Sequence, residues 1–322
     1  MTSKFRSCQI GETARRLLTP GACGQVLAGF AMAAYLVTEQ GELFWLASEN
    51  TLMHPRGLRI AGHFPKLVAG ENFFIKRECI CIAPDLQVHF GNASIWEVSP
   101  IPDNVALEVD TIPTKVKNIF SIGFDLSQAR GFGRLIPRIL SLAGGQLDDE
   151  PEIDPVLALG WAGIYKTARA CLLCDMHGVL QEANALVGLG EGLTPSGDDF
   201  LSGLLFCINT IQRLCPRFIN LDPFEQLSFI ESAKQRTHLI SFTLLKDSSN
   251  GQSVEPFHEL IRAILSDQPP ERIRQLVSCL TQIGHSTGWD LLTGMLTGFL
   301  LTFRSPDLIN SSSVSLKQDI YV

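Results

Sequence analysis

Residues 188–203 read GLGEGLTPSGDDFLSG, and an apolar pattern with helical spacing continues from there through Leu204, Leu205 and Ile208. Glycines at this density permit positive φ angles and close backbone approach, so the stretch predicts a tight loop that leads into a helix. The free N–H groups and partial positive charge of a helix start favour an anion or the polar atoms of a substrate. The loop residues that we expect to bind substrate are Gly190, Gly192, Thr194, Ser196 and Gly197.

A second stretch repeats the first after 91 residues. Residues 196–205 read SGDDFLSGLL and residues 287–296 read TGWDLLTGML, so both fit [ST]-G-x-D-x-L-[ST]-G-x-L without a gap. We expect two equivalent helix starts that pack side by side about a local two-fold axis. Spacing by four residues puts Asp199 with Gly203, and Asp290 with Gly294, on one helix face. Glycines on that face would let the two helices approach closely.

The two aspartates of this repeat have two interpretations. Ser196 with Asp199, and Thr287 with Asp290, have the hydroxyl-x-x-acid spacing of a capping box, in which side chains satisfy the free N–H groups of a helix start. In the functional interpretation Asp199 is catalytic, and Thr287 and Asp290 bind substrate. The two interpretations do not exclude each other.

Asp198 differs from these two aspartates because its counterpart in the repeat is Trp289. Capping explains it less well, so it is a candidate for catalysis or for binding a divalent metal such as Mg²⁺. His285 occupies the place of Thr194 in the repeat, directly before Ser286. If the two helix starts are neighbours, His285 approaches the first loop and becomes a catalytic candidate, with Ser286 beside it as a substrate ligand.

Composition bounds the class of protein. The 322 residues are 45% hydrophobic and carry a formal net charge of −7, and no basic run with interleaved aromatics points to nucleic acid. The 9 cysteines have no disulfide-framework spacing, which is typical of a reducing compartment. The apolar run from Leu27 to Val37 is too short to span a bilayer. We therefore predict a cytoplasmic protein with no membrane partner.

Patterning along the chain predicts an α+β protein. We expect a β-rich N-terminal domain over residues 1–142 and a helical domain, which carries both glycine motifs, over residues 154–309. Glycine, acid and proline cluster in residues 143–153, as in a linker. The serine-rich residues 310–322 predict a flexible tail.

Four local features refine this picture. Periodicity leaves Gly24–Thr38 open between a helix and a buried strand. Ile119–Phe124 reads as a further strand, and Pro223–Lys246 as one long or broken helix. Arg56 lies in a compact basic cluster beside a turn, where it either binds a carboxylate or phosphate bidentately or is an ordinary solvated arginine.

Three motifs carry a resemblance to a known family. Residues 190–203 (GEGLTPSGDDFLSG) and 284–294 (GHSTGWDLLTG) resemble the two signatures of a bacterial family long labelled a domain of unknown function. That family includes the AllH-type subunit of oxamate carbamoyltransferase. Residues 236–241 (RTHLIS) resemble a third, weaker signature and add Arg236 and Thr237 as substrate-binding candidates. The likeness covers most of the chain, although the N-terminal third matches only in outline.

The resemblance implies a role in anaerobic allantoin and purine breakdown. The enzyme of this family interconverts oxalurate plus phosphate with oxamate plus carbamoyl phosphate, and it needs two other subunits, one of them FdrA-like. The resemblance thus implies one part of a multi-subunit complex. Two alternatives remain open: a non-catalytic assembly or regulatory subunit, and a stand-alone metal-assisted enzyme that acts on another small amide or carboxylate.

Charge in the first motif conflicts with simple phosphate binding. Glu191, Asp198 and Asp199 crowd the loop without a lysine or arginine, and each close acid would repel a phosphate by roughly 1 kcal/mol or more. A divalent metal on Asp198, an amide-type substrate, or phosphate held by Arg56, Arg236 or a partner subunit would each resolve the conflict. The chain also lacks the Ser-Thr-Arg-Thr phosphate loop of the ordinary carbamoyltransferases.

Overall fold

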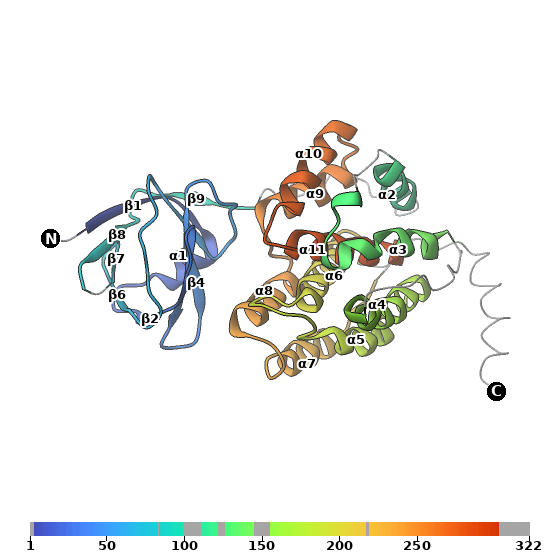
Figure 1. The fold of residues 1–322 in the computed structure, drawn as a ribbon, viewed down its shortest axis with the longest axis horizontal. Helices are drawn as coiled ribbons and strands as arrows, with labels where there is room; N and C mark the ends of the chain where they lie inside the picture. The colour runs from blue at the N-terminus through green and yellow to red at the C-terminus, as the bar shows by residue number, and fades with distance from the viewer. Residues whose placement is uncertain are drawn as a thin grey trace. The chain divides into compact units, whose positions relative to one another are not determined.

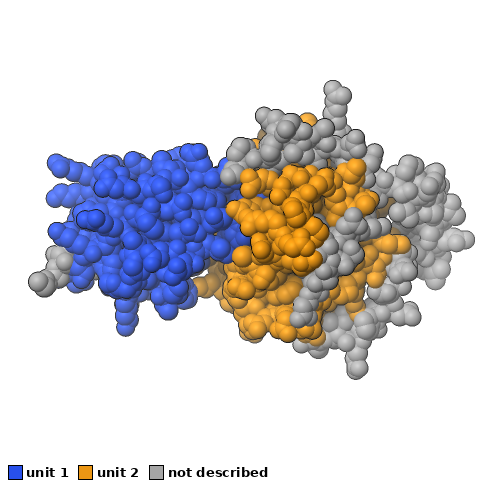
Figure 2. Space-filling model, turned by 90° about the horizontal axis from the view of Figure 1, so that it is seen from above, with its two compact units in different colours: residues 1–100, 252–258 blue, residues 101–251, 259–322 orange. Residues whose placement is uncertain are grey.

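The computed structural model describes residues 3–82, 84–98, 111–121, 126–144, 155–216 and 219–302. The chain divides into two compact units, one of residues 1–100 with 252–258 and the other of residues 101–251 with 259–322 (Figure 2). Strands dominate the first unit and helices dominate the second (Figure 1). This confirms the expected α+β class, with a β-rich first part followed by a mainly helical second part.

The first unit is a sheet that closes on itself. Within residues 3–82 and 84–98, nine strands pair in the order β5-β4-β3-β2-β6-β7-β8-β1-β9, and β1 also pairs with β5 to complete the closure. The strands are β1 (Ser3–Gly11), β2 (Cys23–Gly29), β3 (Ala33–Thr38), β4 (Leu43–Ser48), β5 (Gly57–Ile60), β6 (Asn72–Lys76), β7 (Cys79–Ile82), β8 (Leu86–His89) and β9 (Ser94–Trp96). The stretch Gly24–Thr38, which periodicity left open, thus forms parts of two strands.

Alternation of side chains fills the interior of this closed sheet. In β6, Phe73 and Ile75 are buried while the three residues beside them are exposed, the period of two that a pleated strand imposes. The Phe73 ring packs edge-to-face on Phe44 of β4, with the ring centroids 5.4 Å apart. The short helix α1 (Glu12–Leu17) brings the fully buried Ala14 to the same core.

Residues 252–258 return to this unit from far along the chain. The backbone N–H of Glu255 donates to the carbonyl oxygen of Met53 at 2.8 Å, and the Glu255 carboxylate pairs with Arg59 at 3.0 Å. The same carboxylate accepts a hydrogen bond from the Met53 N–H. The first turn of a helix that begins at Glu255 is therefore a structural part of the β-rich unit.

The second unit is built from helices around a central pair. Its elements are α2 (Ile112–Ser121), η2 (Leu126–Gln128), η3 (Gly131–Leu135), α3 (Ile136–Ala143), α4 (Pro155–Leu173), α5 (Met176–Ala183), η4 (Asn184–Leu186), α6 (Ser196–Leu214), α7 (Pro223–Ala233), α8 (Leu239–Ser249), the rest of α9 (Glu255–Leu265), α10 (Pro270–Thr281), α11 (Thr287–Phe299) and η5 (Leu300–Thr302). Every residue of α11 from Gly288 onward is buried, and α6 is buried over most of its length. Figure 1 shows α6 and α11 in the middle of the helical unit.

The structure settles two local predictions. The predicted strand at Ile119–Phe124 is wrong, because α2 extends to Ser121, and residues 122–125 lie outside the described part. Its residues follow a helical rather than an alternating pattern once the preceding turn from Ile112 is included. The predicted helix over Pro223–Lys246 is broken, because α7 ends at Ala233 and α8 begins at Leu239.

The predicted domain boundaries stay predictions. Of the expected linker, residues 145–153 lie outside the described residues, as does the expected tail from residue 310. No helix among the described residues combines the length and apolar character needed to cross a membrane.

Candidate functional site

The two glycine-headed helices meet at their N-terminal halves. A Cβ atom added to Gly203 of α6 would overlap the Leu291 carbonyl oxygen of α11, and one added to Gly294 would overlap the Phe200 carbonyl oxygen. Phe200 and Leu291 are themselves equivalent positions in the repeat, so the contacts are reciprocal. This confirms the expected pairing, in which glycines let two equivalent helix starts approach closely.

The loop before α6 has the backbone that its glycines predict. Gly188, Gly190 and Gly192 all have positive φ angles, of 72°, 119° and 91°. Gly197, at the first turn of α6, lies against the Leu186 carbonyl, where no Cβ would fit, and its N–H donates to the Leu189 carbonyl oxygen at 2.8 Å. Gly190 and Gly192 are exposed, whereas the helix start that they lead into is buried.

Asp198 joins three segments of the helical unit. It is 1% exposed, and its Oδ1 accepts a hydrogen bond from the N–H of Gly188 at 2.7 Å. Its Oδ2 accepts from the hydroxyls of Thr237 and of Ser241, the latter at 2.7 Å. Both oxygens of this carboxylate therefore have donors from the protein, and the three bonds tie the loop, α6 and the start of α8 together.

Asp199 and Asp290 present the opposite situation. Both are buried, at 3% and 0% exposure, and the Oδ2 atom of each has no hydrogen-bond partner among the described residues. Oδ1 of Asp290 accepts a hydrogen bond from the backbone N–H of Phe132 at 2.6 Å. Buried polar atoms normally have partners, so two orphaned carboxylate oxygens in one place indicate an unused acceptor site.

Burial also changes the acidity of these two groups. Desolvation raises the pKa of Asp290 to about 6, although the Phe132 N–H and the hydroxyls of Ser286 and Ser196 oppose the rise. Desolvation raises the pKa of Asp199 well above its ordinary value, and the charge of Asp290 adds to that rise. The hydroxyls of Thr287 and Thr194 act in the other direction. Burial therefore favours the protonated form of both acids, and Asp290 is suited to exchanging a proton near pH 6.

Four hydroxyl side chains lie over the aspartate pair. Thr194 and Thr287 approach with their Oγ1 atoms 3.3 Å apart, and Ser196 and Ser286 with their Oγ atoms 3.4 Å apart. Each contact crosses from the start of α6 to the start of α11. The structure thus brings these predicted site residues together, and all four are half-buried.

The capping-box interpretation of this repeat is wrong. The N-cap residues are Pro195 for α6 and Ser286 for α11, and neither makes a side-chain cap hydrogen bond. Ser196 and Thr287 are already the first residues of their helices. The aspartates consequently lie one position deeper in the helix than a capping box requires, where they face the neighbouring helix start.

A segment that the sequence analysis missed completes the site. Gly131 of η3 has a φ of 51°, and a Cβ there would lie 2.5 Å from Asp290 Oδ1 and 2.7 Å from Ser286 Cβ. The residue before it, Arg130, is exposed and places its Nη1 atom 3.4 Å from Nδ1 of the exposed His285. The two closely spaced glycines, Gly131 and Gly133, were the available signal, but they indicate only a tight turn and not a contact with Asp290.

The two arginines predicted to bind substrate have other partners. Arg236 donates from Nη1 to Oδ1 of Asn184 at 2.6 Å, and its carbonyl oxygen lies against Gly188. Arg56 belongs to the β-rich unit, where its buried side chain pairs with Glu42 at 3.2 Å and donates to the Leu43 carbonyl at 2.9 Å. The alternative of a solvated Arg56 is therefore wrong, because the side chain is 7% exposed.

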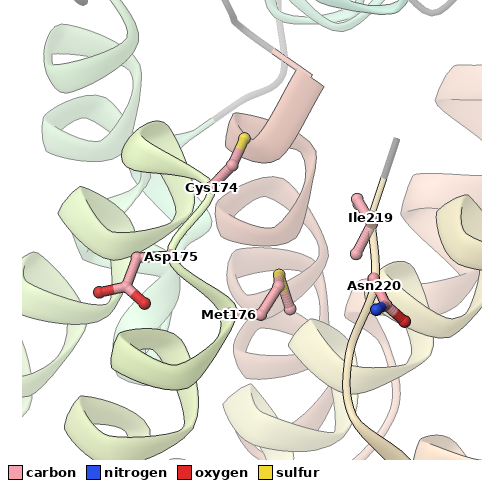
Figure 3. A pocket seen from close by; sticks show the side chains of 5 residues that line it. All are labelled: Cys174, Asp175, Met176, Ile219 and Asn220. Carbon is pink, nitrogen blue, oxygen red and sulfur yellow. The ribbon is translucent and has the colours of Figure 1, made fainter. Parts of the chain in front are cut away.

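A surface pocket elsewhere in the helical unit contains none of the predicted site residues. It has a volume of about 270 Å³ and is lined by Cys174, Asp175, Met176, Ile219 and Asn220 (Figure 3). Its walls come from the α4–α5 connection and from the segment before α7. Among the described residues, no group of three or more histidine, cysteine or acidic side chains is placed to hold a metal ion.

Comparison with known families agrees with this geometry. The family model for the oxamate carbamoyltransferase subunit AllH matches residues 186–299, a range that contains both helix starts. The model for the AllH family N-terminal domain matches residues 6–95, which correspond to the closed sheet. No solved structure matches the chain. The two family matches together cover more than half of the sequence, and the chain belongs to the AllH family.

Proposed function

We propose that the chain is a subunit of an oxamate-carbamoyltransferase-like complex of the cytoplasm, acting in anaerobic allantoin and purine catabolism. The complex interconverts oxalurate plus phosphate with oxamate plus carbamoyl phosphate, and an FdrA-like protein is one of its other subunits. The observation that carries the proposal is that the AllH match spans both helix starts, where two buried carboxylates have oxygens without partners.

The reaction requires a group that accepts and returns a proton, and these carboxylates can supply it. When oxamate attacks carbamoyl phosphate, its amide nitrogen forms a bond to the carbamoyl carbon while the carbon–oxygen bond to phosphate breaks. One proton must leave that nitrogen, and in the reverse direction it must return. A positioned carboxyl group whose pKa is close to the working pH is an effective proton acceptor and donor. Asp290, with its pKa raised to about 6, fits this role.

Asp199 supports the same chemistry from the other helix. Burial raises the pKa of Asp199 well above its ordinary value and so favours its protonated form. A protonated carboxyl group can donate a hydrogen bond to the carbamoyl carbonyl oxygen, on which negative charge develops during transfer. The hydroxyls of Thr194, Ser196, Ser286 and Thr287 supply further donors at the same place.

One observation favours the alternative of a non-catalytic assembly subunit. Both carboxylate oxygens of Asp198 accept hydrogen bonds that connect the loop, α6 and the start of α8. Gly203 and Gly294 allow the two helices to pack closely. Much of the motif therefore has a structural explanation that needs no chemistry. The alternative with a metal on Asp198 lacks such support, because both oxygens of that carboxylate already accept hydrogen bonds.

The test is phosphate-dependent breakdown of oxalurate, detected as carbamoyl phosphate, with the chain alone and with the chain copurified with its native partners. We expect activity in the copurified sample and a loss of about 100-fold or more in Asp290→Asn, with the complex intact by size-exclusion chromatography. Glu191→Gln removes an exposed acid from the same loop and serves as the matched control, with activity retained.

Two results would count against the proposal. No carbamoyl phosphate from a complex whose partners are confirmed would exclude the oxamate assignment. Full activity of Asp290→Asn in an active complex would exclude proton transfer by this residue and would favour the assembly role.

A further inference from the structure

Two basic side chains lie at the exposed edge of the aspartate pair. Arg130 Nη1 is 3.4 Å from His285 Nδ1, and because a guanidinium only donates, this histidine nitrogen is the acceptor. The proton of a neutral His285 is then on Nε2. Both side chains consequently have N–H groups left to offer to an anion.

The backbone connects this basic pair directly to the buried acids. The next residue after Arg130 is Gly131, which lies against Asp290 and Ser286, and the N–H of Phe132 is bonded to Asp290. The next residue after His285 is Ser286, whose hydroxyl approaches Ser196. The turns that lead into η3 and α11 therefore place the basic side chains of Arg130 and His285 beside the buried aspartate pair.

Two carboxylate oxygens of the aspartate pair have no hydrogen-bond donor among the described residues. The Oδ2 atoms of Asp199 and Asp290 are buried without partners, and leaving such acceptors unsatisfied is unfavourable. The hydroxyl contacts above them, at 3.3 and 3.4 Å, are longer than the ordinary O–H···O distance of about 2.7–2.8 Å. Breaking these weak hydroxyl contacts therefore costs little free energy, and a ligand can then bring N–H groups to the carboxylates.

We propose that the junction of α6, α11 and η3 binds a small molecule with amide N–H groups at one end and an anionic group at the other. The unpartnered Oδ2 atoms of Asp199 and Asp290 accept the N–H groups, and Arg130 with His285 binds the anion. This inference rests on the proposed function and deepens it, since oxamate, oxalurate and carbamoyl phosphate each have both ends. Inorganic phosphate has no N–H group and does not satisfy the buried acceptors.

The proposal answers the charge conflict in the first motif. Asp199, one of the acids that would repel phosphate, recognises the amide together with Asp290, while the anion lies at the exposed edge beside Arg130. Neither Arg56 nor Arg236 is needed, and both have protein partners already.

The test is isothermal titration of the complex, and of the chain alone, with four probes: oxamate, oxalate, acetamide and inorganic phosphate. Oxalate keeps the anion without the N–H groups, and acetamide keeps the N–H groups without the anion. We expect oxamate to bind at least about tenfold more tightly than the other three, since each of them leaves one end of the site unsatisfied.

Variants separate the two ends of the site. Arg130→Ala should weaken oxamate binding about tenfold or more. Arg134→Ala, which removes an exposed arginine of η3, the short helix that follows Arg130, should leave it unchanged. Asp290→Asn should weaken oxamate about tenfold and oxalate far less, and circular dichroism checks that each variant is folded. This contrast between probes is not expected of a residue that serves only the fold.

The outcomes also separate this inference from the proposed function. Phosphate or oxalate binding as tightly as oxamate, no oxamate binding in either sample, or unchanged binding in both site variants would overturn the inference, even in a complex that catalyses carbamoyl transfer. Selective oxamate binding that depends on Arg130 would support it, even if the complex fails to break down oxalurate.

Discussion

The starts of α6 and α11 share a sequence pattern but use one position differently. Both have an aspartate with an unpartnered oxygen and a glycine against the partner helix. At the position before that aspartate, α6 has Asp198, bonded to the start of α8, whereas α11 has Trp289, packed against Gly133 of the segment from η3. The repeated residues thus build the junction, and the position that differs fixes each helix to its own neighbour.

This difference separates residues whose polar atoms the protein satisfies from residues that keep an oxygen without a partner among the described residues. Asp198 and Trp289 are satisfied by the protein, so their loss should be seen in stability. Asp199 and Asp290 are buried at a cost, because desolvation raises the pKa of each. A residue that lowers stability while buried in a family-defining motif is more readily explained by function than by the fold.

The largest effect is expected at the shared glycines. Gly203→Ala and Gly294→Ala would each drive a Cβ into a backbone carbonyl of the facing helix, which cannot move as a side chain can. We expect each to lower the free energy of unfolding by about 3 kcal/mol or more, measured by urea denaturation. If the two starts are equivalent, the two losses should be similar.

Gly192→Ala is the control for these variants. Gly192 has a φ of 91° but nothing within 4 Å of an added Cβ, so only its backbone conformation is strained, at about 1–2 kcal/mol. A large loss for one of the paired glycines and none for the other would break the equivalence of the two helices.

The next largest effect is expected at Asp290, where the substitution should raise the free energy of unfolding instead of lowering it. A folded-state pKa of about 6, above the ordinary 3.8, means that Asp290 favours the folded state only while protonated. That contribution is complete below about pH 4 and is lost as the pH rises through about 6. Asp290→Asn keeps an acceptor for the Phe132 N–H and removes the charge. We therefore expect it to raise the free energy of unfolding by up to about 3 kcal/mol at pH 8.

Urea denaturation at pH 4 and pH 8 measures this difference. The groups that face Asp290 are Asp199, the Phe132 N–H and the hydroxyls of Ser196 and Ser286, and of these only Asp199 is titratable. Equal stabilisation at both pH values, or a loss at pH 8, would contradict a buried acid that is held without a partner.

The smallest change in stability is expected at Asp198, and it tests whether Asp198 serves the fold while Asp199 and Asp290 do not. Asp198→Asn replaces a carboxylate that accepts three hydrogen bonds with an amide that has one oxygen. We expect it to lower the free energy of unfolding by about 2 kcal/mol, with oxamate affinity retained in the folded fraction. Unchanged stability together with lost turnover would instead support the catalytic role that the sequence suggested for this residue.

The sequence predicted the junction well where the motif itself carries the geometry. The repeat predicted that Gly203 and Gly294 would lie in a helix contact, and the loop glycines predicted positive φ. It placed Thr194, Ser196, Ser286, Thr287, Asp199 and Asp290 in one region, as the structure does. It did not distinguish the role of Asp198, because its partners Thr237 and Ser241 come from a segment more than thirty residues away.

Other features depend on packing that a single sequence does not encode locally. The η3 segment reaches Asp290 through a backbone N–H, which every residue except proline has, so no side-chain pattern marks Phe132. The capping-box prediction was wrong because the same spacing also fits a helix whose first residue is the hydroxyl residue, as at Ser196 and Thr287. Arg56 resembled an anion ligand, but its burial against Glu42 follows from the closed sheet.

The return of residues 252–258 to the closed sheet has a consequence for synthesis of the chain. The last strand among the described residues, β9, ends at Trp96, yet Glu255, which bonds Met53 and pairs with Arg59, is added much later. At about 5–20 residues per second, the ribosome needs roughly 8–30 s to add the intervening residues. The N-terminal unit therefore emerges early but is completed late, and for that interval it exists as a nascent intermediate whose missing piece is still being translated.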